Sequence, residues 1–440
     1  MTMRPQLLRT ALGVLRHPKA TRAELKTFQD AQLRRLLLHA YESVPYYRKL
    51  FDRHRLHPKH IRGTVDLDLI PISTKQDFRS RRVAELVMRG VDPDRLLSAR
   101  TNGSTGEPFQ VRRTWMEQSL NALFRERCWR AFGLRSHERV ATVGQPRRPD
   151  ARDTKIVGRA LGALGVHPTI RLDGMQPPEL VANRLAAFRP HMLVAIPGML
   201  CLVADYLISS GRQDIRPRIL VTGGEVLTPL MRQRLIHAFG VEPVQTYASH
   251  EFPFMAWECR NTGEMHTSDD GTVLEVLRDG RPAAPGETGE VVVTNLHAYA
   301  MPFIRYRLAD VVTRGAEQCA CGQPFSTIRA IQGRMIDYFP LPGGRLLHPY
   351  EILNRIPRVD TWIRQYHLLQ DRPDRIVMQV VPSQGTLPEL QQMISQAVAP
   401  LIGPHIEFQV RMVDVIPAGP GGKRRHSCSL ISSAYDGLSS

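Results

Sequence analysis

The stretch Ile219–Gly240, ILVTGGEVLTPLMRQRLIHAFG, contains the pattern that decides the fold. Ile219–Thr222 are apolar or β-branched, which predicts a short buried strand. Thr228 is a suitable N-cap before Pro229, and Gly240 is a suitable stop for the helix that follows. The stretch therefore predicts one strand–loop–helix unit of an α/β sheet.

Similar units precede this stretch. Residues 140–143 and 192–196 have the pattern of strands, while 179–188 and 199–209 have the pattern of helices. Alternating strands and helices predict a doubly wound, mostly parallel sheet. After about residue 250, short apolar runs separated by Gly, Asp and Pro predict a smaller β-rich part that extends to residue 336.

The chain is expected to contain two domains. A helical opening over residues 1–60 belongs to the large N-terminal domain, residues 1–336. Beyond it, a hairpin around 342–344, paired strands between 367 and 381, and an amphipathic helix from Leu390 predict a smaller α+β domain over residues 337–440.

Composition excludes several classes of protein. Of the 440 residues 42% are hydrophobic, so the chain can bury a core and is not disordered. Its longest apolar stretch, 192–204, is shorter than the about 20 residues of a membrane-spanning helix and contains Pro197. Because the N-terminus also lacks the pattern of a secretory signal, we expect a cytoplasmic protein.

The positive charge is uneven. The net charge is +17, and residues 1–60 hold 13 Lys and Arg against four acidic residues. Such a segment could contact nucleic acid, an anionic membrane surface or a phosphorylated ligand, or could be a solvated helical face. No pattern of interleaved basic and aromatic residues accompanies it, so nucleic acid is not the expected partner, whereas peripheral membrane contact stays open.

A hydroxyl- and glycine-rich loop, TNGSTGEP, occupies residues 101–108 between two strand-like runs. Its glycines permit tight turns with exposed N–H groups, and its hydroxyls can donate to phosphate oxygens. No Lys-Ser/Thr pair follows the last glycine, so it is not a Walker loop. The loop predicts a phosphate site, and an ordinary polar turn is the alternative.

Two further motifs follow strands that are expected to be parallel. Gly223-Gly224-Glu225 follow the first strand, and Thr246-Tyr247-Ala248-Ser249-His250-Glu251 end the next. Open α/β sheets bind ligands at the carboxyl ends of their strands. Tyr247 offers a flat surface for a base, and Glu251 offers an oxygen ligand for Mg²⁺.

Cys259, His266, Cys319 and Cys321 have the composition of a tetrahedral zinc site. Cys-Ala-Cys-Gly has the form of a metal knuckle, since its glycine permits a tight turn around an ion. Four protein ligands leave no open position, which predicts a structural Zn²⁺. The alternative is four unrelated polar or buried residues.

In the order of its motifs the chain resembles the adenylate-forming superfamily, and within it the phenylacetate-CoA ligase family with its relatives from polysaccharide gene clusters. The resemblance runs from LRRLLLHAYESVPYYRKLF through TNGSTGEP, TGGE, YASHE, GETGEVVVTNL, MPFIRYRLAD and GRMIDYF to PGGKRR. It therefore covers nearly the whole chain.

The resemblance implies a large adenylation domain, a mobile C-terminal domain and a role for each motif residue. The phosphates of ATP would be held by Thr101, Asn102, Gly103, Ser104, Thr105 and Gly106, and the adenine by Gly223, Gly224, Glu225, Thr246 and Tyr247. Asp310 would bind the ribose hydroxyls, and Arg334 would lie near ribose and phosphate. Thr105 and Glu251 would bind Mg²⁺. Asp337 would be the hinge of the mobile domain, and Lys423 would be the catalytic lysine. The acid pocket is expected near Gln145, Ala248 and His250.

The chain departs from the family pattern at three positions. Ala248 and Ala309 stand where the family usually has glycine, in Tyr-Gly and Thr-Gly-Asp, and Glu107 stands where many superfamily members have lysine. Neither alanine removes a charged catalytic group. A weaker phosphate contact or an altered nucleotide preference remains open.

These observations lead to one expected function and two alternatives. The first is ATP-dependent activation of a carboxylic acid, aryl or arylacetic by resemblance, to an acyl-adenylate, then thioester formation with CoA by a homodimer. The second keeps adenylation but transfers the acyl group to an amine, hydroxyl or carrier-protein thiol. The third is a non-catalytic binder of nucleic acid or membrane surface on a ligase fold.

Overall fold

The computed structural model describes residues 13–100, 110–144, 167–174, 176–334, 339–341, 346–347, 352–353, 355–356, 362–382, 389–417 and 427–430. The chain divides into two compact units, Met1–Gln332 and Gly333–Ser440. This division falls four residues before the expected domain boundary. Among the described residues, no helix combines the length and the apolar character needed to cross a membrane.

The helical opening consists of two consecutive helices, α2 (Arg22–Ser43) and α3 (Pro45–Arg53). A capping box begins α2, because Thr21 accepts from the Glu24 backbone and Glu24 accepts from the Thr21 backbone. Pro45 ends the expected apolar pattern, and it also occupies the first turn of α3, where a missing N–H costs nothing. The other helices of this unit are α4 (Lys75–Arg79), α5 (Val83–Leu86), α6 (Trp115–Ala131), α8 (Pro178–Phe188), α9 (Pro197–Ser209) and α10 (Pro229–Phe239), with short 3₁₀ helices η1 (His17–Lys19), η2 (Pro58–His60), η3 (Thr64–Leu69) and η4 (Pro93–Arg95).

A 12-stranded sheet forms the centre of the first unit, in the order β11-β10-β12-β13-β14-β9-β8-β7-β6-β5-β3-β4. Strands β4, β3, β5, β6 and β7 are mutually parallel, and the described pairings from β7 through β8 to β9 are antiparallel. The strands are β3 (Val140–Gly144), β4 (Thr169–Asp173), β5 (Met192–Ala195), β6 (Ile219–Gly223), β7 (Pro243–Tyr247), β8 (Ala256–Glu258), β9 (Met265–Thr267), β10 (Thr272–Arg278), β11 (Arg281–Pro282), β12 (Thr288–Asn295), β13 (Tyr306–Arg314) and β14 (Thr327–Arg334).

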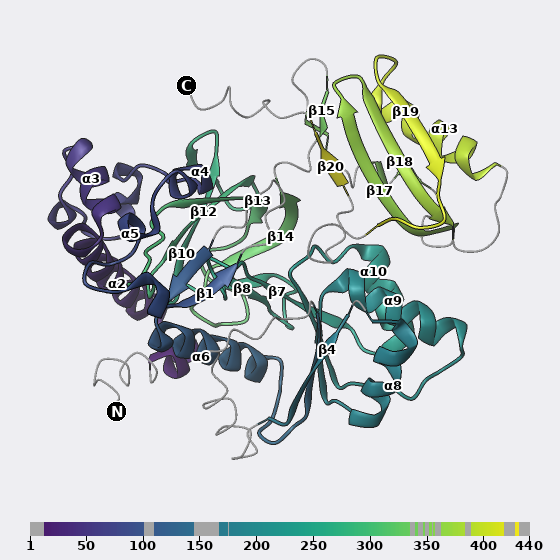
Figure 1. Ribbon diagram of the computed structural model, residues 1–440, viewed down its shortest axis with the longest axis horizontal. Helices are drawn as coiled ribbons and strands as arrows, with labels where there is room; N and C mark the ends of the chain where they lie inside the picture. Colours follow the sequence, from purple (N-terminus) through teal and green to yellow (C-terminus); the bar gives the residue numbers. More distant parts are fainter. Residues whose placement is uncertain are drawn as a thin grey trace. The chain divides into compact units, whose positions relative to one another are not determined.

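Helices cover both faces of the parallel part, so the predicted doubly wound architecture is confirmed (Figure 1). One face packs against α8, α9 and α10 through residues such as Leu185, Leu200 and Leu235. The other face packs against α6 through Cys128 and Phe132. Strands buried on both faces need continuous apolar runs, which explains the sequence of β6.

The unit Ile219–Gly240 folds as its sequence predicts. Thr228 Oγ1 accepts from Met231 N at 3.1 Å, and Pro229 opens α10. Gly240 ends the helix with φ of +70°, a left-handed conformation that favours glycine. Gly223 therefore lies at the carboxyl end of β6, and the capped helix α10 leads from there to the next strand.

The second unit contains a four-stranded sheet with the order β19-β18-β17-β20 and one long helix, α13 (Leu390–Ile402). Leu390, Ile394 and Val398 are buried on one face of α13, as the amphipathic pattern predicts. A short pair flanks the expected hairpin at 342–344. The strands are β15 (Phe339–Pro340), β16 (Leu346–Leu347), β17 (Ile363–Arg372), β18 (Arg375–Pro382), β19 (Glu407–Met412) and β20 (Ser427–Ser429).

Candidate functional site

The carboxyl ends of β6 and β7 bring together the two motifs predicted for the adenine site. Gly223 and Thr246 are direct partners in the parallel ladder. A Cβ added to Gly223 would lie 2.6 Å from Thr246 Oγ1 and 3.0 Å from Thr246 O, so only glycine fits there. Gly224 follows with φ of +83°. Small residues thus leave space at the carboxyl ends of these two strands.

Tyr247 and Asp310 meet although their strands are far apart in the sheet. Asp310 belongs to β13, and three strands separate β13 from β7, which ends at Tyr247. The Tyr247 hydroxyl donates to Asp310 Oδ2 at 2.6 Å, and both residues are buried. The residue expected to hold the base and the residue expected to hold the ribose are therefore in direct contact. We call Gly223, Thr246, Tyr247, Glu251 and Asp310 the strand-end site.

Glu251 is a buried carboxylate in the turn that follows β7. It is 6% exposed. Asn295 donates to the carbonyl oxygen of Glu251. Among the described residues, none donates a hydrogen bond to its carboxylate or forms an ion pair with it. A divalent cation bound to this carboxylate would supply a partner that the described residues do not. The residue therefore fits the role of a Mg²⁺ ligand.

Glu225 makes a specific contact beside this site. Its Oε2 accepts from Gly198 N at 3.1 Å, at the start of α9. Ile196, the N-cap residue of α9, provides no side-chain cap, so Glu225 satisfies a backbone donor that would otherwise lack a partner. The carboxylate consequently ties the loop after β6 to α9. Its expected role beside the adenine stays a prediction.

The four residues predicted to bind zinc lie together. The candidate ligand atoms of Cys259, His266, Cys319 and Cys321 are all within 4.8 Å of one another. Cys259 follows β8, His266 belongs to β9, and the other two cysteines lie between β13 and β14. His266 Nε2 is 3.3 Å from Cys321 Sγ, so Nε2 is the nitrogen that faces the thiols.

Tight turns position these thiols. Gly322 has φ of +90° directly after Cys321, and its N–H donates to Cys319 O at 3.1 Å. This is the knuckle expected from Cys-Ala-Cys-Gly. Burial, together with the nearby positive charge of Arg127, lowers the pKa of His266 to about 4, so the imidazole is neutral at pH 7. Three thiols and a neutral imidazole form a donor set suited to Zn²⁺.

Several predicted residues lie outside the described part of the chain. These are the phosphate loop with Thr101, Asn102, Gly103, Ser104, Thr105 and Gly106, the pocket residue Gln145, the hinge Asp337 and the catalytic Lys423. Arg334 ends β14, but its side chain is likewise not described. Ala248 and His250 belong to the turn after Tyr247, and the His250 carbonyl accepts from the Arg113 guanidinium.

Several known proteins are similar to the chain in sequence. The chain is 26% identical to the phenylacetate-coenzyme A ligase of Thermus thermophilus over 84% of its own length and 81% of that protein. It is 29% identical to the Escherichia coli phenylacetate-coenzyme A ligase over 66% of this chain and 67% of that protein. Protein CapK of Staphylococcus aureus is 22% identical, with 93% and 90% of the two chains covered. No family model matches the sequence.

The chain is thus similar to four phenylacetate-CoA ligases, at 26–29% identity. Solved structures are similar to the chain in fold. The crystal structure of 2-hydroxyisobutyryl-CoA ligase in the postadenylation state has a TM-score of 0.79, with 19% identity over 93% of this chain and 90% of that chain. The anthranilate CoA ligase AuaEII has a TM-score of 0.55, with 15% identity over 74% and 65% of the two chains. The predicted resemblance to adenylate-forming enzymes is confirmed.

The two alanines that replace the glycines usual in the phenylacetate-CoA ligase family differ in conformation. Ala309, next to Asp310, has φ of +62°, in the left-handed region. Ala248 is not among the described non-glycine residues with positive φ. The chain therefore tolerates backbone strain beside Asp310, and alanine causes no such strain after Tyr247.

Three residues with long-range contacts in the first unit were not singled out from the sequence. Arg113 and Asn295 contact the turn that carries Glu251. Glu117 closes a capping box at the start of α6 and also accepts from the backbone N–H groups of Tyr299 and Ala300, at 2.6 and 2.8 Å. The Thr-x-x-Glu pattern of Thr114 and Glu117 was a readable signal. The other contacts join residues more than 40 positions apart, so no local pattern indicates them.

Proposed function

We propose that this protein is an AMP-forming acid–CoA ligase that activates an aryl or arylacetic acid. The observation that supports it most directly is the hydrogen bond between Tyr247, at the carboxyl end of β7, and Asp310 of β13, the two residues expected to bind the nucleoside. The names of the relatives, phenylacetate-coenzyme A ligase in Thermus thermophilus and Escherichia coli, support the substrate class.

The reaction has two steps. A carboxylate oxygen of the acid attacks the α-phosphorus of ATP, a new P–O bond forms, and pyrophosphate leaves. The CoA thiolate then attacks the acyl carbonyl, the thioester bond forms, and AMP leaves. Negative charge grows at the α-phosphate in the first step, so positive charge placed there in advance supplies much of the rate enhancement.

Each residue has a proposed part in the first step. Tyr247 packs against the adenine, Asp310 accepts from the ribose hydroxyls, and Glu251 holds Mg²⁺ together with Thr105. Bound Mg²⁺ would screen the charge of the phosphate oxygens. We assign Lys423 to the developing charge at the α-phosphate, because a lysine on a flexible stem can deliver a point charge there. Asp337 is the proposed hinge between the half-reactions.

We propose a structural Zn²⁺ at the Cys/His cluster. Four ligand atoms within 4.8 Å of one another suit a tetrahedral ion with bonds of about 2.0–2.3 Å. The ion would tie the segment after β8 to the turn between β13 and β14 and would take no part in the reaction. A cytoplasmic homodimer and peripheral membrane contact through the basic N-terminal segment complete the proposal. Light scattering and vesicle sedimentation test these two features.

The deciding experiment measures pyrophosphate release from ATP and Mg²⁺ with a panel of aryl, arylacetic and fatty acids, with and without CoA. Lys423→Ala is expected to lower the rate about 10²–10³-fold, whereas the adjacent Arg424→Ala serves as the matched control. Release that requires one acid, is accompanied by CoA consumption and is lost in Lys423→Ala is the expected result. AMP formation without CoA consumption would indicate another acyl acceptor. Absence of acid-dependent release would contradict the proposal.

A further inference from the structure

Side chains from two distant strands hold the backbone of the turn that carries Glu251. Arg113, the last residue of β2 (Gln110–Arg113), donates through Nη2 to the carbonyl of His250. Asn295, the last residue of β12, donates through Nδ2 to the carbonyl of Glu251 at 3.4 Å. Both donors are buried, with 8% and 7% exposure. Two consecutive carbonyls are therefore fixed from outside the turn.

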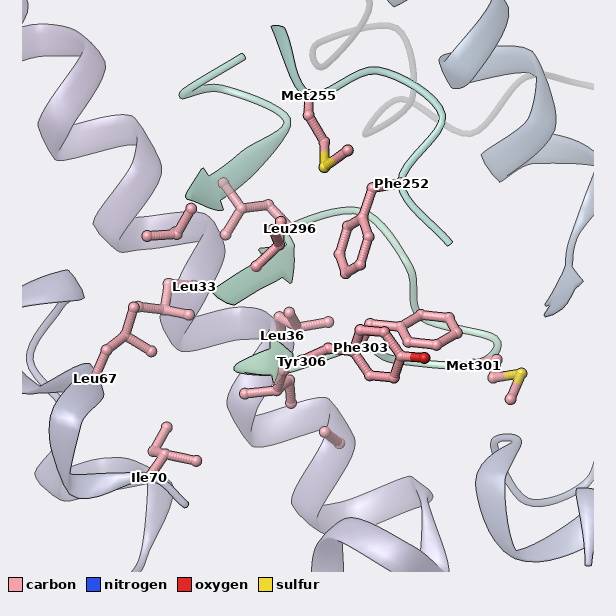
Figure 2. Close-up of a cluster of buried hydrophobic side chains, with 14 of the residues drawn as sticks. Leu33, Leu36, Leu67, Ile70, Phe252, Met255, Leu296, Met301, Phe303 and Tyr306 are labelled. Atoms are coloured by element: carbon pink, nitrogen blue, oxygen red, sulfur yellow. The ribbon is translucent and has the colours of Figure 1, made fainter. Parts of the chain in front are cut away.

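The turn is also fixed from within. Ser249 N donates to Phe252 O at 2.8 Å, and Phe252 N donates to Ser249 Oγ at 3.1 Å. The Phe252 ring is fully buried beside Phe303, with ring centroids 5.7 Å apart (Figure 2). Met255 from the same segment lies in this hydrophobic cluster too. The backbone that follows Glu251 is consequently anchored in the core.

The orientation of Asn295 is determined by its own contacts. Its Oδ1 accepts from His297 N at 3.1 Å, which leaves the Nδ2 donor to face the carbonyl of Glu251. Its backbone N–H donates to Phe303 O at 3.0 Å. Asn295 thus connects the Phe303 segment of the core with the Glu251 turn.

We propose that Arg113 and Asn295 are positioning residues that hold the Glu251 carboxylate where it ligates Mg²⁺. This inference rests on the proposed function, because it takes Glu251 as the metal ligand. Residues that orient a metal ligand typically change metal affinity or activity about 10–100-fold when they are replaced. Arg113 also begins a connection to α6, since Thr114 caps that helix. The turn is therefore attached to the strand that follows the phosphate-loop motif in the sequence.

Arg112 provides a matched control on the same strand. Its guanidinium donates to Pro93 O at 3.1 Å and to Gln110 Oε1 at 2.8 Å, away from residues 249–252. Successive side chains of a strand point to opposite faces, so the two arginines report on different surroundings. Arg112→Met removes a partly buried cation of the same type without a described contact to the Glu251 turn.

The experiment combines a kinetic and a structural measurement on the full-length protein. The first is the Mg²⁺ concentration that half-saturates acid-dependent pyrophosphate–ATP exchange, alongside the KM for the acid. The second is hydrogen exchange over residues 247–255 without any ligand. We expect Arg113→Met to raise the Mg²⁺ requirement about 10–100-fold, leave the acid KM unchanged, and accelerate exchange in this peptide. Arg113→Lys should change both measurements less than Arg113→Met does. Asn295→Ala should raise the Mg²⁺ requirement and accelerate exchange, and Arg112→Met should change neither.

Two results would overturn the inference. One is an Arg113→Met protein whose Mg²⁺ requirement and peptide exchange equal those of Arg112→Met. The other is an Arg113→Met protein in which Mg²⁺ affinity, acid affinity and thermal stability all fall to the same extent. Such a result would mean that the substitution only destabilises the fold. If the wild-type protein shows no exchange with any acid, the proposed function fails. Faster peptide exchange in Arg113→Met then still supports the role of Arg113 in holding the turn, and unchanged exchange contradicts it.

Discussion

The strand-end site and the Cys/His cluster differ in how their polar groups are satisfied. At the strand-end site the Tyr247 hydroxyl already donates to the Asp310 carboxylate at 2.6 Å. At the cluster the described contacts include the one between His266 Nε2 and Cys321 Sγ at 3.3 Å, and sulfur is a weak hydrogen-bond partner. In the first region Tyr247 and Asp310 therefore satisfy each other without a ligand. The second is expected to need its ion.

The largest effect is therefore expected from loss of the metal. Cys259→Ala should abolish zinc binding and lower the free energy of unfolding of the first unit by several kcal/mol, since structural zinc contributes directly to folding. Cys201→Ala is the matched control, because both thiols are 6% exposed and only Cys259 belongs to the cluster. Elemental analysis and calorimetry provide the measurements. Equal zinc content in the two variants would contradict the assignment.

A smaller effect is expected at the strand-end site from Tyr247→Phe, which keeps the ring and removes the hydroxyl. Asp310 is buried, so loss of the tyrosine donor should lower the free energy of unfolding by about 1–3 kcal/mol. The ribose hydroxyls of ATP would replace this donor. Saturating ATP should therefore raise the melting temperature of Tyr247→Phe more than that of the wild type. An equal rise would show that ATP does not substitute for the tyrosine hydroxyl.

Helix α10 and the Cys/His cluster were predictable, because their residues carry local signals. Thr228, Pro229 and Gly240 define α10 by capping chemistry, which depends on neighbours within four residues. The cluster was predictable because thiols and imidazoles have few other roles in combination. In each case the residue type indicates the role directly, as a helix cap or as a metal ligand.

The contacts that complete the sites could not be predicted, since they depend on how distant segments meet. Tyr247 and Asp310 are 63 positions apart, and Arg113 and His250 are 137 apart. The local sequence around an arginine at the end of a short strand does not tell whether its guanidinium donates to a distant carbonyl or is solvated. The same applies to the buried Asp270, which pairs with Arg127 and His17 beside the cluster. Such pairs are set by the sheet order.

The smallest expected effect concerns two alanines beside the strand-end site, and its sign differs between them. Ala309 has φ of +62°, where an L-residue costs about 1–2 kcal/mol and glycine costs little. Glycine loses about 0.4–1 kcal/mol through the greater entropy of the unfolded chain. Ala309→Gly should therefore raise the free energy of unfolding by about 0.5–1 kcal/mol. Ala248→Gly, at a position without positive φ, should lower it by a similar amount because no strain is relieved.

Calorimetry of the two variants separates backbone strain from a general effect of glycine near the site. The expected shifts in melting temperature are about 1–3 °C and opposite in sign. A decrease in both variants would show that the surroundings of Asp310 impose the left-handed conformation without a cost that glycine can recover. An increase at Ala309 alone, with an unchanged KM for ATP, would show that the chain keeps Asp310 in place despite the strained residue before it.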